Sequence, residues 1–232
     1  MNMFAYIEEN LAQIRAAADA AAETSPYGQA YDILLATKYA SAEEINYAAS
    51  LGYTRIGENR VQSLLEKYEK LDREKLDIHF IGTLQKNKVK YIIDKVSMIE
   101  SVDSLDLARE IEKQAAKHGL VMDCLLEVNI GREENKSGIL PENVLPLADA
   151  LDAFPHIRLC GLMTMAPKCA ETEEYRKYFR ESYHIFIDIC EKKLHNVDRR
   201  ILSMGMSDSF PAALAEGANL IRVGRAAFQK EK

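Results

Sequence analysis

Eight short apolar runs recur along the chain, and the segments between them show helical spacing of their apolar residues. The runs are DILLATK (32–38), YTRIGE (53–58), DIHFIG (77–82), VSMIES (96–101), MDCLLEVNI (122–130), IRLCGLMTM (157–165), RILSMG (200–205) and NLIRVG (219–224). Continuous apolar runs are typical of parallel strands covered on both faces. Eight strand–helix units close naturally into a barrel, and 232 residues suffice for one. We therefore predict an α/β fold, a (β/α)8 TIM-type barrel.

The rest of the chain is consistent with one domain over residues 1–232. No Gly/Ser/Pro-rich linker divides it, and we expect residues 1–30 to form a helical extension packed on the barrel, with the helix itself at Met3 to Glu23. Ser41 and Asp103 each have an acid three residues later, a pattern that predicts helix starts. A doubly wound open sheet is the alternative, but no GxGxxG motif follows the first strand.

Composition excludes several function classes. The net charge of -6 argues against a nucleic-acid surface, and the basic stretch QKNKVKY (85–91) is interpreted as a solvated helix face. The four cysteines and five histidines show no metal-ligand spacing. The N-terminal segment is not a signal peptide, and no apolar run approaches the ~20 residues of a membrane span. We expect a cytoplasmic protein that binds neither membranes nor metal.

Polar and glycine residues collect where the predicted strands end. In a barrel these carboxyl ends share one face, which carries the reactive groups. The strand-end set comprises Lys38, Gly57–Asn59, His79, Gly82, Ser101, Asn129, Met163–Met165, Ser203–Ser207, Arg222 and Gly224. Lys38 is therefore either a solvated side chain or a chemical group facing a common pocket.

Two late segments predict a phosphate site. SMGMSDSFPAALAEG (203–217) and RVGRAAF (222–228) each end a strand in a glycine turn and then start a helix. Loops after strands seven and eight of barrels often hold phosphate through free backbone N–H groups. Ser207 can donate its hydroxyl, while Gly205 and Gly224 permit close backbone approach. The alternative is that Ser207 or Asp208 simply caps a helix.

A lysine and a phosphate cradle in one pocket suggest a phosphorylated carbonyl compound held as a Schiff base, as in sugar-phosphate aldolases and in proteins that bind pyridoxal 5′-phosphate (PLP). Arg222 lies just before the phosphate turn. An arginine cannot accept a proton, so beside a pyridine nitrogen it would keep that nitrogen unprotonated. Pairing of Arg222 with a barrel carboxylate is the alternative.

The chain resembles the pyridoxal phosphate homeostasis proteins, whose barrel is that of the alanine racemase N-terminal domain (fold type III). The resemblance rests on LLATKYAS, RIGENRVQ, HFIGTLQKNKVKYI, LLEVNIGREENKSGI, GLMTMAP and LSMGMSDSFPAALAEGANLIRVGRAAF, in this order from Tyr31 to Phe228. It implies PLP as cofactor and the following roles: Lys38 forms the Schiff base, Arg222 faces the pyridine nitrogen, Ser207, Gly224 and the Arg225 backbone contact phosphate, and Asn59 and Met204 line the ring. Two positions depart from the family: Ile78 replaces a frequent tryptophan, and Arg225 replaces a threonine or serine that contacts phosphate.

The resemblance implies a non-catalytic PLP-binding protein of intracellular PLP homeostasis, which stores or delivers the cofactor. The alternative is an amino-acid racemase or related PLP enzyme, which needs a second base, commonly a tyrosine, and a second β domain. None of the 11 tyrosines is assignable opposite Lys38, and the chain ends after its eighth unit. A Schiff-base aldolase fits Lys38 but not these motifs. We expect a monomer or weak dimer with apo PLP-dependent enzymes as recipients, and the loop Glu134 to Ile139 is a candidate gate of the pocket.

Overall fold

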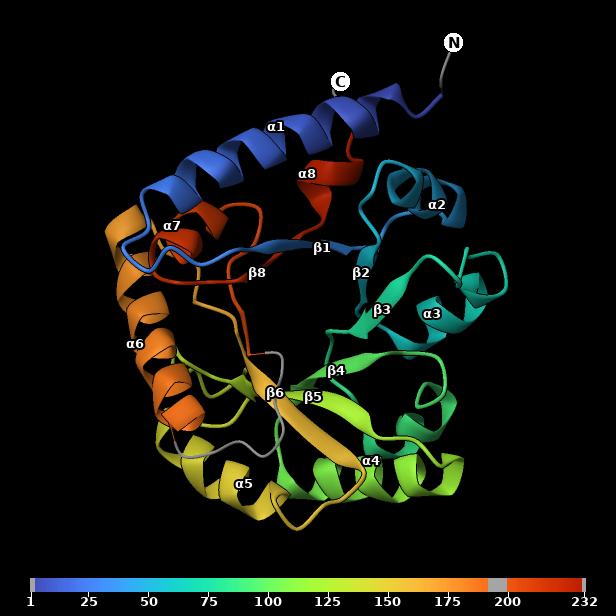
Figure 1. Ribbon diagram of the computed structural model, residues 1–232, viewed down its shortest axis with the longest axis vertical. Coiled ribbons are helices and arrows are strands. Elements are labelled where there is room, and N and C mark those ends of the chain that lie inside the picture. Colours follow the sequence, from blue (N-terminus) through green and yellow to red (C-terminus); the bar gives the residue numbers. More distant parts are fainter. Residues whose placement is uncertain (1–2, 192–199, 231–232) are drawn as a thin grey trace.

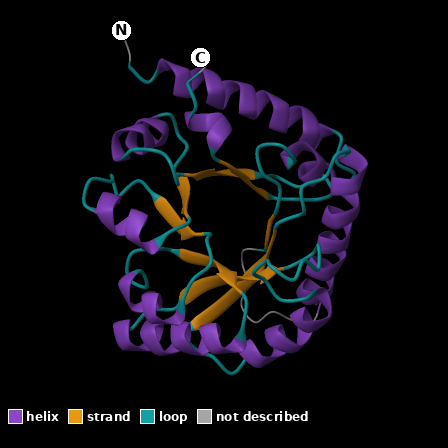
Figure 2. Cartoon of the chain, turned by 180° about the vertical axis from the view of Figure 1, so that it is seen from behind, coloured by secondary structure: helices purple, strands orange, loops and turns teal. Residues whose placement is uncertain are grey.

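The strands form a closed ring surrounded by helices, as Figure 2 shows. The computed structural model describes residues 3–191 and 200–230. The strands are β1 (Asp32–Ala36), β2 (Arg55–Glu58), β3 (Asp77–Phe80), β4 (Met98–Val102), β5 (Met122–Val128), β6 (Ile157–Thr164), β7 (Ile201–Ser203) and β8 (Leu220–Val223). Every neighbouring pair is parallel, and β1 closes the ring on β8, where Leu34 is opposite Arg222. The predicted (β/α)8 barrel is confirmed.

The helical elements cover the outside of this ring. They are α1 (Ala5–Glu23), α2 (Ala42–Ser50), α3 (Val61–Tyr68), the 3-10 helix η1 (Lys86–Tyr91), α4 (Leu105–His118), the 3-10 helix η2 (Pro141–Asn143), α5 (Val144–Leu151), α6 (Thr172–Glu191), α7 (Phe210–Ala215) and α8 (Arg225–Phe228). The basic stretch forms η1, which buries Val89 and leaves its lysines exposed. The helical spacing in the sequence covers residues 171–194 and corresponds to α6. Residues 192–194 lie outside the described part of the chain.

Two helix starts test the capping pattern. Ser41 forms a complete capping box with Glu44: its side chain accepts from the Glu44 N–H, and the Glu44 carboxylate accepts from the Ser41 N–H. The prediction for Asp103 is wrong by one residue. Ser104 is the N-cap of α4, and its hydroxyl accepts from the Leu107 N–H. Serine and aspartate are equally suited to this position, so spacing alone does not choose between neighbours.

Successive strand residues point to opposite faces of the ring. Ile33 and Leu35 of β1 pack into the large cluster between strands and helices, whereas Leu34 packs with Ile81 and Leu220 inside the barrel. The same alternation directs the side chains of three polar residues into the barrel, because their strand neighbours belong to the outer cluster: Glu100, Ser203 and Arg222. The interior is therefore partly polar.

Helix α1 lies across α7 and α8, so the two ends of the described chain are side by side in Figure 1. The amide of Asn10 donates to the carbonyl oxygens of Ala227 (3.2 Å) and Gln229 (2.9 Å). The amide of Gln29, just beyond α1, donates to Leu214 (2.9 Å) and Ala218 (3.1 Å). These contacts attach the N-terminal segment to the two helices that follow the last two strands.

Candidate cofactor site

Lys38 lies in a turn immediately after β1, at the carboxyl end of the barrel. The turn is tied to the next strand, because the Thr37 N–H donates to the Gly57 carbonyl at 3.0 Å. The Lys38 side chain is exposed, and its Nζ lies 4.8 Å from the centre of the Tyr39 ring. A flexible, solvent-accessible amine at a strand end is available for covalent chemistry with a carbonyl.

An ion pair between Lys67 and the buried Glu58 holds the residue before Lys38 in place. Lys67 of α3 donates to the Thr37 carbonyl at 2.9 Å and pairs with Glu58. The Glu58 carboxylate also accepts from the Thr37 hydroxyl at 2.7 Å and is 1% exposed. The residue before Lys38 is thus held through both its backbone and its side chain. Sequence reasoning did not find Lys67, although an apolar strand that ends in glutamate was a signal for Glu58.

The turn after β7 contains a conformationally constrained glycine, Gly205, and a serine, Ser207, whose hydroxyl has no hydrogen-bond partner in the described residues. Gly205 has φ +88°, and a Cβ there would lie 2.6 Å from the Ala213 Cβ, so no other residue fits without a shift. Ser209, not Ser207 or Asp208, is the N-cap residue of α7. The Ser207 hydroxyl makes no hydrogen bond within the described part of the chain and is half-buried. The helix-cap alternative for Ser207 and Asp208 is therefore wrong, because neither residue caps α7.

The turn after β8 brings backbone close to the end of β1. A Cβ on Gly224 would lie 3.0 Å from the Ala36 carbonyl oxygen, so only glycine leaves this approach unobstructed. Arg225 begins α8, and its side chain is exposed. The first N–H groups of a helix have no partner within the helix and can bind an anion.

Three cationic side chains gather around Tyr39 at this end of the barrel. A hydrogen bond to Lys38 and the charge of Lys38 lower the pKa of Tyr39, and the charges of Arg225 and Arg60 add to this effect. The strand order explains the gathering, because β8 is the neighbour of β1 and β2 is its other neighbour. The surface around Lys38 thus attracts anions.

Arg222 differs from these cations because it is buried inside the barrel, with 4% of its surface exposed. Its NH1 donates to the Ser203 hydroxyl and its NH2 to the Thr164 carbonyl, each at 2.7 Å. Burial lowers the pKa of Arg222, an effect that the charges of Glu100 and Glu127 oppose. No salt bridge joins Arg222 to a carboxylate in the described residues, so the two barrel acids act on it at a distance.

The remaining predicted residues divide into two groups. Asn59 directly follows β2 and is half-buried, so it lies at the same end of the barrel as Lys38. Met204 is fully buried in the outer cluster between strands and helices, and it offers no surface to a ring in this conformation. Met206, two residues later, is 44% exposed at the mouth. The strand has ended at Ser203, and the turn at Gly205, with φ +88°, separates the two methionines.

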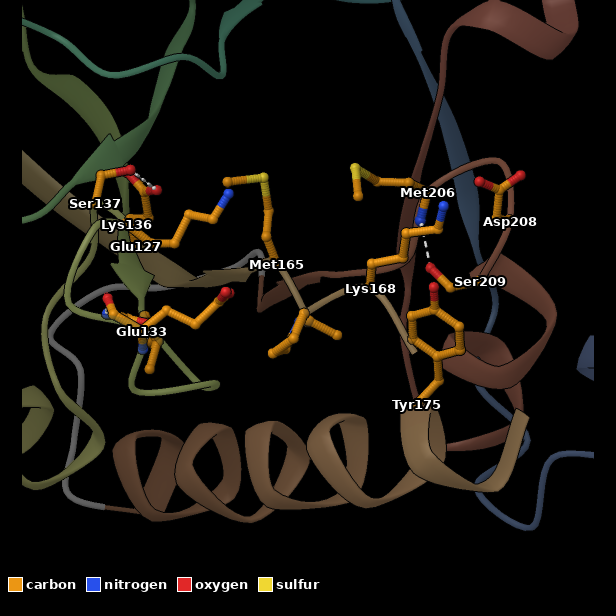
Figure 3. Close-up of a pocket in the computed structure, with 14 residues that line it drawn as sticks. Glu127, Glu133, Lys136, Ser137, Met165, Lys168, Tyr175, Met206, Asp208 and Ser209 are labelled. Atoms are coloured by element: carbon orange, nitrogen blue, oxygen red, sulfur yellow. Dashed lines mark hydrogen bonds between the residues drawn. The ribbon is translucent and has the colours of Figure 1, made fainter. Parts of the chain in front are cut away.

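A pocket of about 370 Å³ opens beside the β7 turn, between the loops that follow β5, β6 and β7 (Figure 3). Met165 and Met206 line it, together with Lys136 from the loop after β5. Ser137 folds back to donate to the Glu127 carboxylate at 2.6 Å. Burial raises the pKa of Glu127, and the bond from Ser137 only partly opposes this. Neither Lys38 nor Arg222 lines the pocket, so it adjoins the lysine site and does not contain it. The gate suggested for this loop stays a prediction.

Two classes of site are not found among residues 3–191 and 200–230. No group of three His, Cys, Asp or Glu side chains there could hold a metal ion. No helix in that part is long and apolar enough to cross a membrane.

Known proteins match this chain along almost its whole length. The family model of the alanine racemase N-terminal domain matches residues 5–231. A pyridoxal phosphate homeostasis protein from Aquifex aeolicus is 42% identical over 200 residues, which cover 86% of this chain and 87% of that protein. The chain belongs to the pyridoxal phosphate homeostasis protein family. The resemblance in the sequence motifs is confirmed.

Solved structures of family members and of more distant proteins share the barrel. PipY of Synechococcus elongatus, in a structure with PLP bound, is 29% identical with a TM-score of 0.82, covering 96% of this chain and all of PipY. A diaminopimelate decarboxylase from Helicobacter pylori has a TM-score of 0.74 at 13% identity, covering 97% of this chain and 62% of the enzyme. The decarboxylase shows the fold alone. The curated relatives of this chain carry a name that refers to the homeostasis of a cofactor and not to a reaction.

Within this family fold, the predicted residues come from four neighbouring strands. Ser207 follows β7, Arg222 lies in β8 and Gly224 follows it, Lys38 follows β1 and Asn59 follows β2. The order of these strands around the ring is β7, β8, β1, β2. The side chain of Met204 points away from this face, into the outer cluster.

Proposed function

We propose that this protein binds PLP at the carboxyl end of the barrel, with Lys38 as the covalent attachment residue, and stores or delivers the cofactor without turning over amino acids. The observation that carries the proposal is the placement of an exposed lysine after β1, next to the strand that carries the buried Arg222 and to the glycine turns predicted to hold phosphate. The PLP-bound structure of PipY supports the same cofactor for this chain.

The residues present fit each part of PLP. Ser207, Gly205 and the amides at Gly224 and Arg225 would hold the phosphate, with the Arg225 side chain adding positive charge. Arg222 would face the ring nitrogen, and Asn59 would border the ring. PLP, when bound, supplies a carbonyl group and an electron-withdrawing ring. Lys38 would hold that carbonyl as a Schiff base.

The arginine disfavours amino-acid chemistry. Arg222 donates hydrogen bonds and cannot accept a proton, so it would leave the ring nitrogen unprotonated. An unprotonated ring withdraws electrons poorly, which removes the main driving force for decarboxylation and transamination. Racemisation also needs a proton donor on the face opposite Lys38. Tyr39 is adjacent to Lys38 in the same turn and its ring contacts the Lys38 amine, so it is not placed opposite.

Attachment is tested by borohydride reduction of the PLP-loaded protein followed by peptide mass mapping. We expect loss of the visible absorbance band and a pyridoxyl mass on the peptide that contains Lys38. The Lys38→Ala variant should lack both. Labelling confined to other lysines would refute the assignment.

Function is tested on the same loaded protein. L- and D-amino acids are added while chirality and keto-acid formation are followed, and transfer of PLP to an apo-enzyme is timed in parallel. We expect transfer without turnover. Turnover on the order of 1 per second or faster, an ordinary enzyme rate, would instead establish the racemase or related enzyme. Cytoplasmic location, a monomeric or weakly dimeric state and apo-enzyme recipients belong to this proposal.

A further inference from the structure

A chain of polar side chains crosses the inside of the barrel behind Arg222. The Ser203 hydroxyl accepts from Arg222 NH1 at 2.7 Å and donates to Glu100 Oε2 at 2.6 Å. The other oxygen of that carboxylate, Oε1, lies 2.6 Å from His79 Nδ1. All four side chains are at least 96% buried. The proposed function uses only the first of them, Arg222.

His79 connects this chain to the amino end of the barrel. Its Nε2 lies 3.4 Å from an Asp77 carboxylate oxygen, and Asp77 also pairs with Arg55 of β2. Burial lowers the pKa of His79, but hydrogen bonds to Asp77 and Glu100 outweigh burial and raise that pKa to about 9. His79 is therefore a cation at neutral pH, and both of its ring nitrogens donate.

Glu100 lies in the middle of this chain and links His79 to Ser203. Its two oxygens are committed to different partners, one to His79 and one to Ser203. The pKa of Glu100 is lower than its ordinary value. Burial raises this pKa, but the hydrogen bond and charge of His79 and the charge of Arg222 together outweigh burial. The charge of Glu127 in β5 also acts on Arg222, and burial raises the pKa of Glu127.

The bond to Glu100 fixes the direction of the Ser203 hydroxyl. Because the Ser203 proton points to Glu100, the oxygen lone pairs face Arg222. The guanidinium is then held at NH1 by Ser203 and at NH2 by the Thr164 carbonyl. No other hydrogen bond from the guanidinium is found in the described part of the chain.

We propose that Glu100 is a positioning residue for the cofactor ring: through Ser203 it holds the Arg222 guanidinium in the direction needed to meet the ring nitrogen of PLP. This inference rests on the proposed function, in which Arg222 faces that nitrogen. Glu100 itself touches neither Lys38 nor the ligand turns in the described contacts.

The test compares two ligands on the Glu100→Gln variant. One is PLP, and the other is its carbocyclic analogue in which a CH group replaces the ring nitrogen. Glutamine keeps the size of the side chain but removes its charge and one of its two acceptor oxygens, so the bonds to His79 and Ser203 weaken and Arg222 is held less firmly. We expect the Kd for PLP to rise roughly tenfold, as for loss of one charge-assisted hydrogen bond, and the Kd for the analogue to stay unchanged. Equal weakening of both ligands would overturn the inference.

Two further variants separate positioning from stability. Ser203→Ala removes the bridge and should reproduce the selective loss for PLP. Glu216→Gln is the matched control, because Glu216 is 3% exposed and pairs with Arg176 and Arg180 away from this chain. It should lower stability without changing the ratio of the two Kd values. A selective loss of PLP binding in Glu216→Gln would also overturn the inference.

A measurement without cofactor distinguishes this inference from the proposed function. NMR titration of the His79 ring in the ligand-free protein should show a cation at pH 8, and Glu100→Gln should lower its pKa by at least one unit. A His79 pKa that is the same in wild type and Glu100→Gln would overturn the buried chain whatever the ligands do. If the wild type binds neither ligand although His79 has the expected pKa, the proposed function is overturned and this inference with it.

Discussion

The Nζ of Lys67 lies 2.9 Å from the carbonyl oxygen of Thr37, the residue directly before Lys38. A second bond to the Ala40 carbonyl, at 3.3 Å, joins the same ammonium to the other side of the turn. The shape of the Lys38 turn thus depends on a side chain from α3, the helix after the neighbouring strand.

Replacing Lys67 with methionine should weaken both folding and PLP loading. The change leaves Glu58 buried without its cation, which costs about 3 kcal/mol of unfolding free energy. Denaturant unfolding measures that loss, and absorbance titration measures the fraction loaded. Lys75→Met is the control, because its ion pair with Asp72 is exposed and its loss should change neither quantity. Unaltered loading of Lys67→Met would show that the turn does not need this ammonium.

Stability should fall between neutral and alkaline pH because of His79. Its pKa is about 9 in the folded protein and 6.5 as the ordinary value. A raised folded pKa contributes stability that is complete below pH 6.5 and is lost as the pH rises through 9, about 3 kcal/mol in all. The free energy of unfolding of wild type minus that of His79→Gln should shrink by this amount over the interval. Parallel curves for the two proteins would contradict the assignment.

Ser207→Ala should weaken PLP binding through the phosphate alone. One charge-assisted hydrogen bond is worth about 1.5–3 kcal/mol. Pyridoxal, which lacks the phosphate, should bind weakly to wild type and equally weakly to the variant. Titration of both ligands into both proteins gives the comparison, and an equal effect on the two ligands would remove Ser207 from the phosphate site.

Gly205→Ala should be far more damaging than Gly28→Ala, although both glycines have positive φ. Alanine in this conformation costs about 1 kcal/mol at either position. At Gly205 the new Cβ also meets Ala213 at 2.6 Å, whereas nothing lies within 4 Å at Gly28. We expect about 3 kcal/mol of lost stability at Gly205, given the cost of overpacking, and reduced PLP affinity there only. Equal losses in thermal unfolding at both sites would contradict the crowding argument.

The sequence predicted the parts of this fold that depend on local patterns. The barrel follows from eight apolar runs, and the placement of Lys38 and Arg222 follows from the rule that strand ends share a face. The basic stretch interpreted as a solvated helix face forms the 3-10 helix at Lys86–Tyr91. The cap at Ser104 was missed by one residue, because the neighbouring Asp103 offered an equally good local signal.

Contacts between distant segments could not be predicted in the same way. Ser203 and Glu100 are 103 residues apart, and only closure of the ring brings them into contact. An acid within the apolar run VSMIES was the available signal for Glu100, but it does not identify a partner. For Met204, by contrast, the prediction from the motif differs from the position of the side chain in the fold. A motif places it near the ring, while the alternation of strand faces turns its side chain outward.

The position of α1 across α7 and α8 couples a remote helix to the ligand. Both of those short helices begin at the turns proposed to hold phosphate, and Asn10 is bonded to the end of α8. Ligand that orders the turns therefore lowers the free energy of the state in which α1 is docked, by thermodynamic linkage. Amide hydrogen exchange in α1 should become slower when PLP is bound, in a segment that the ligand never touches.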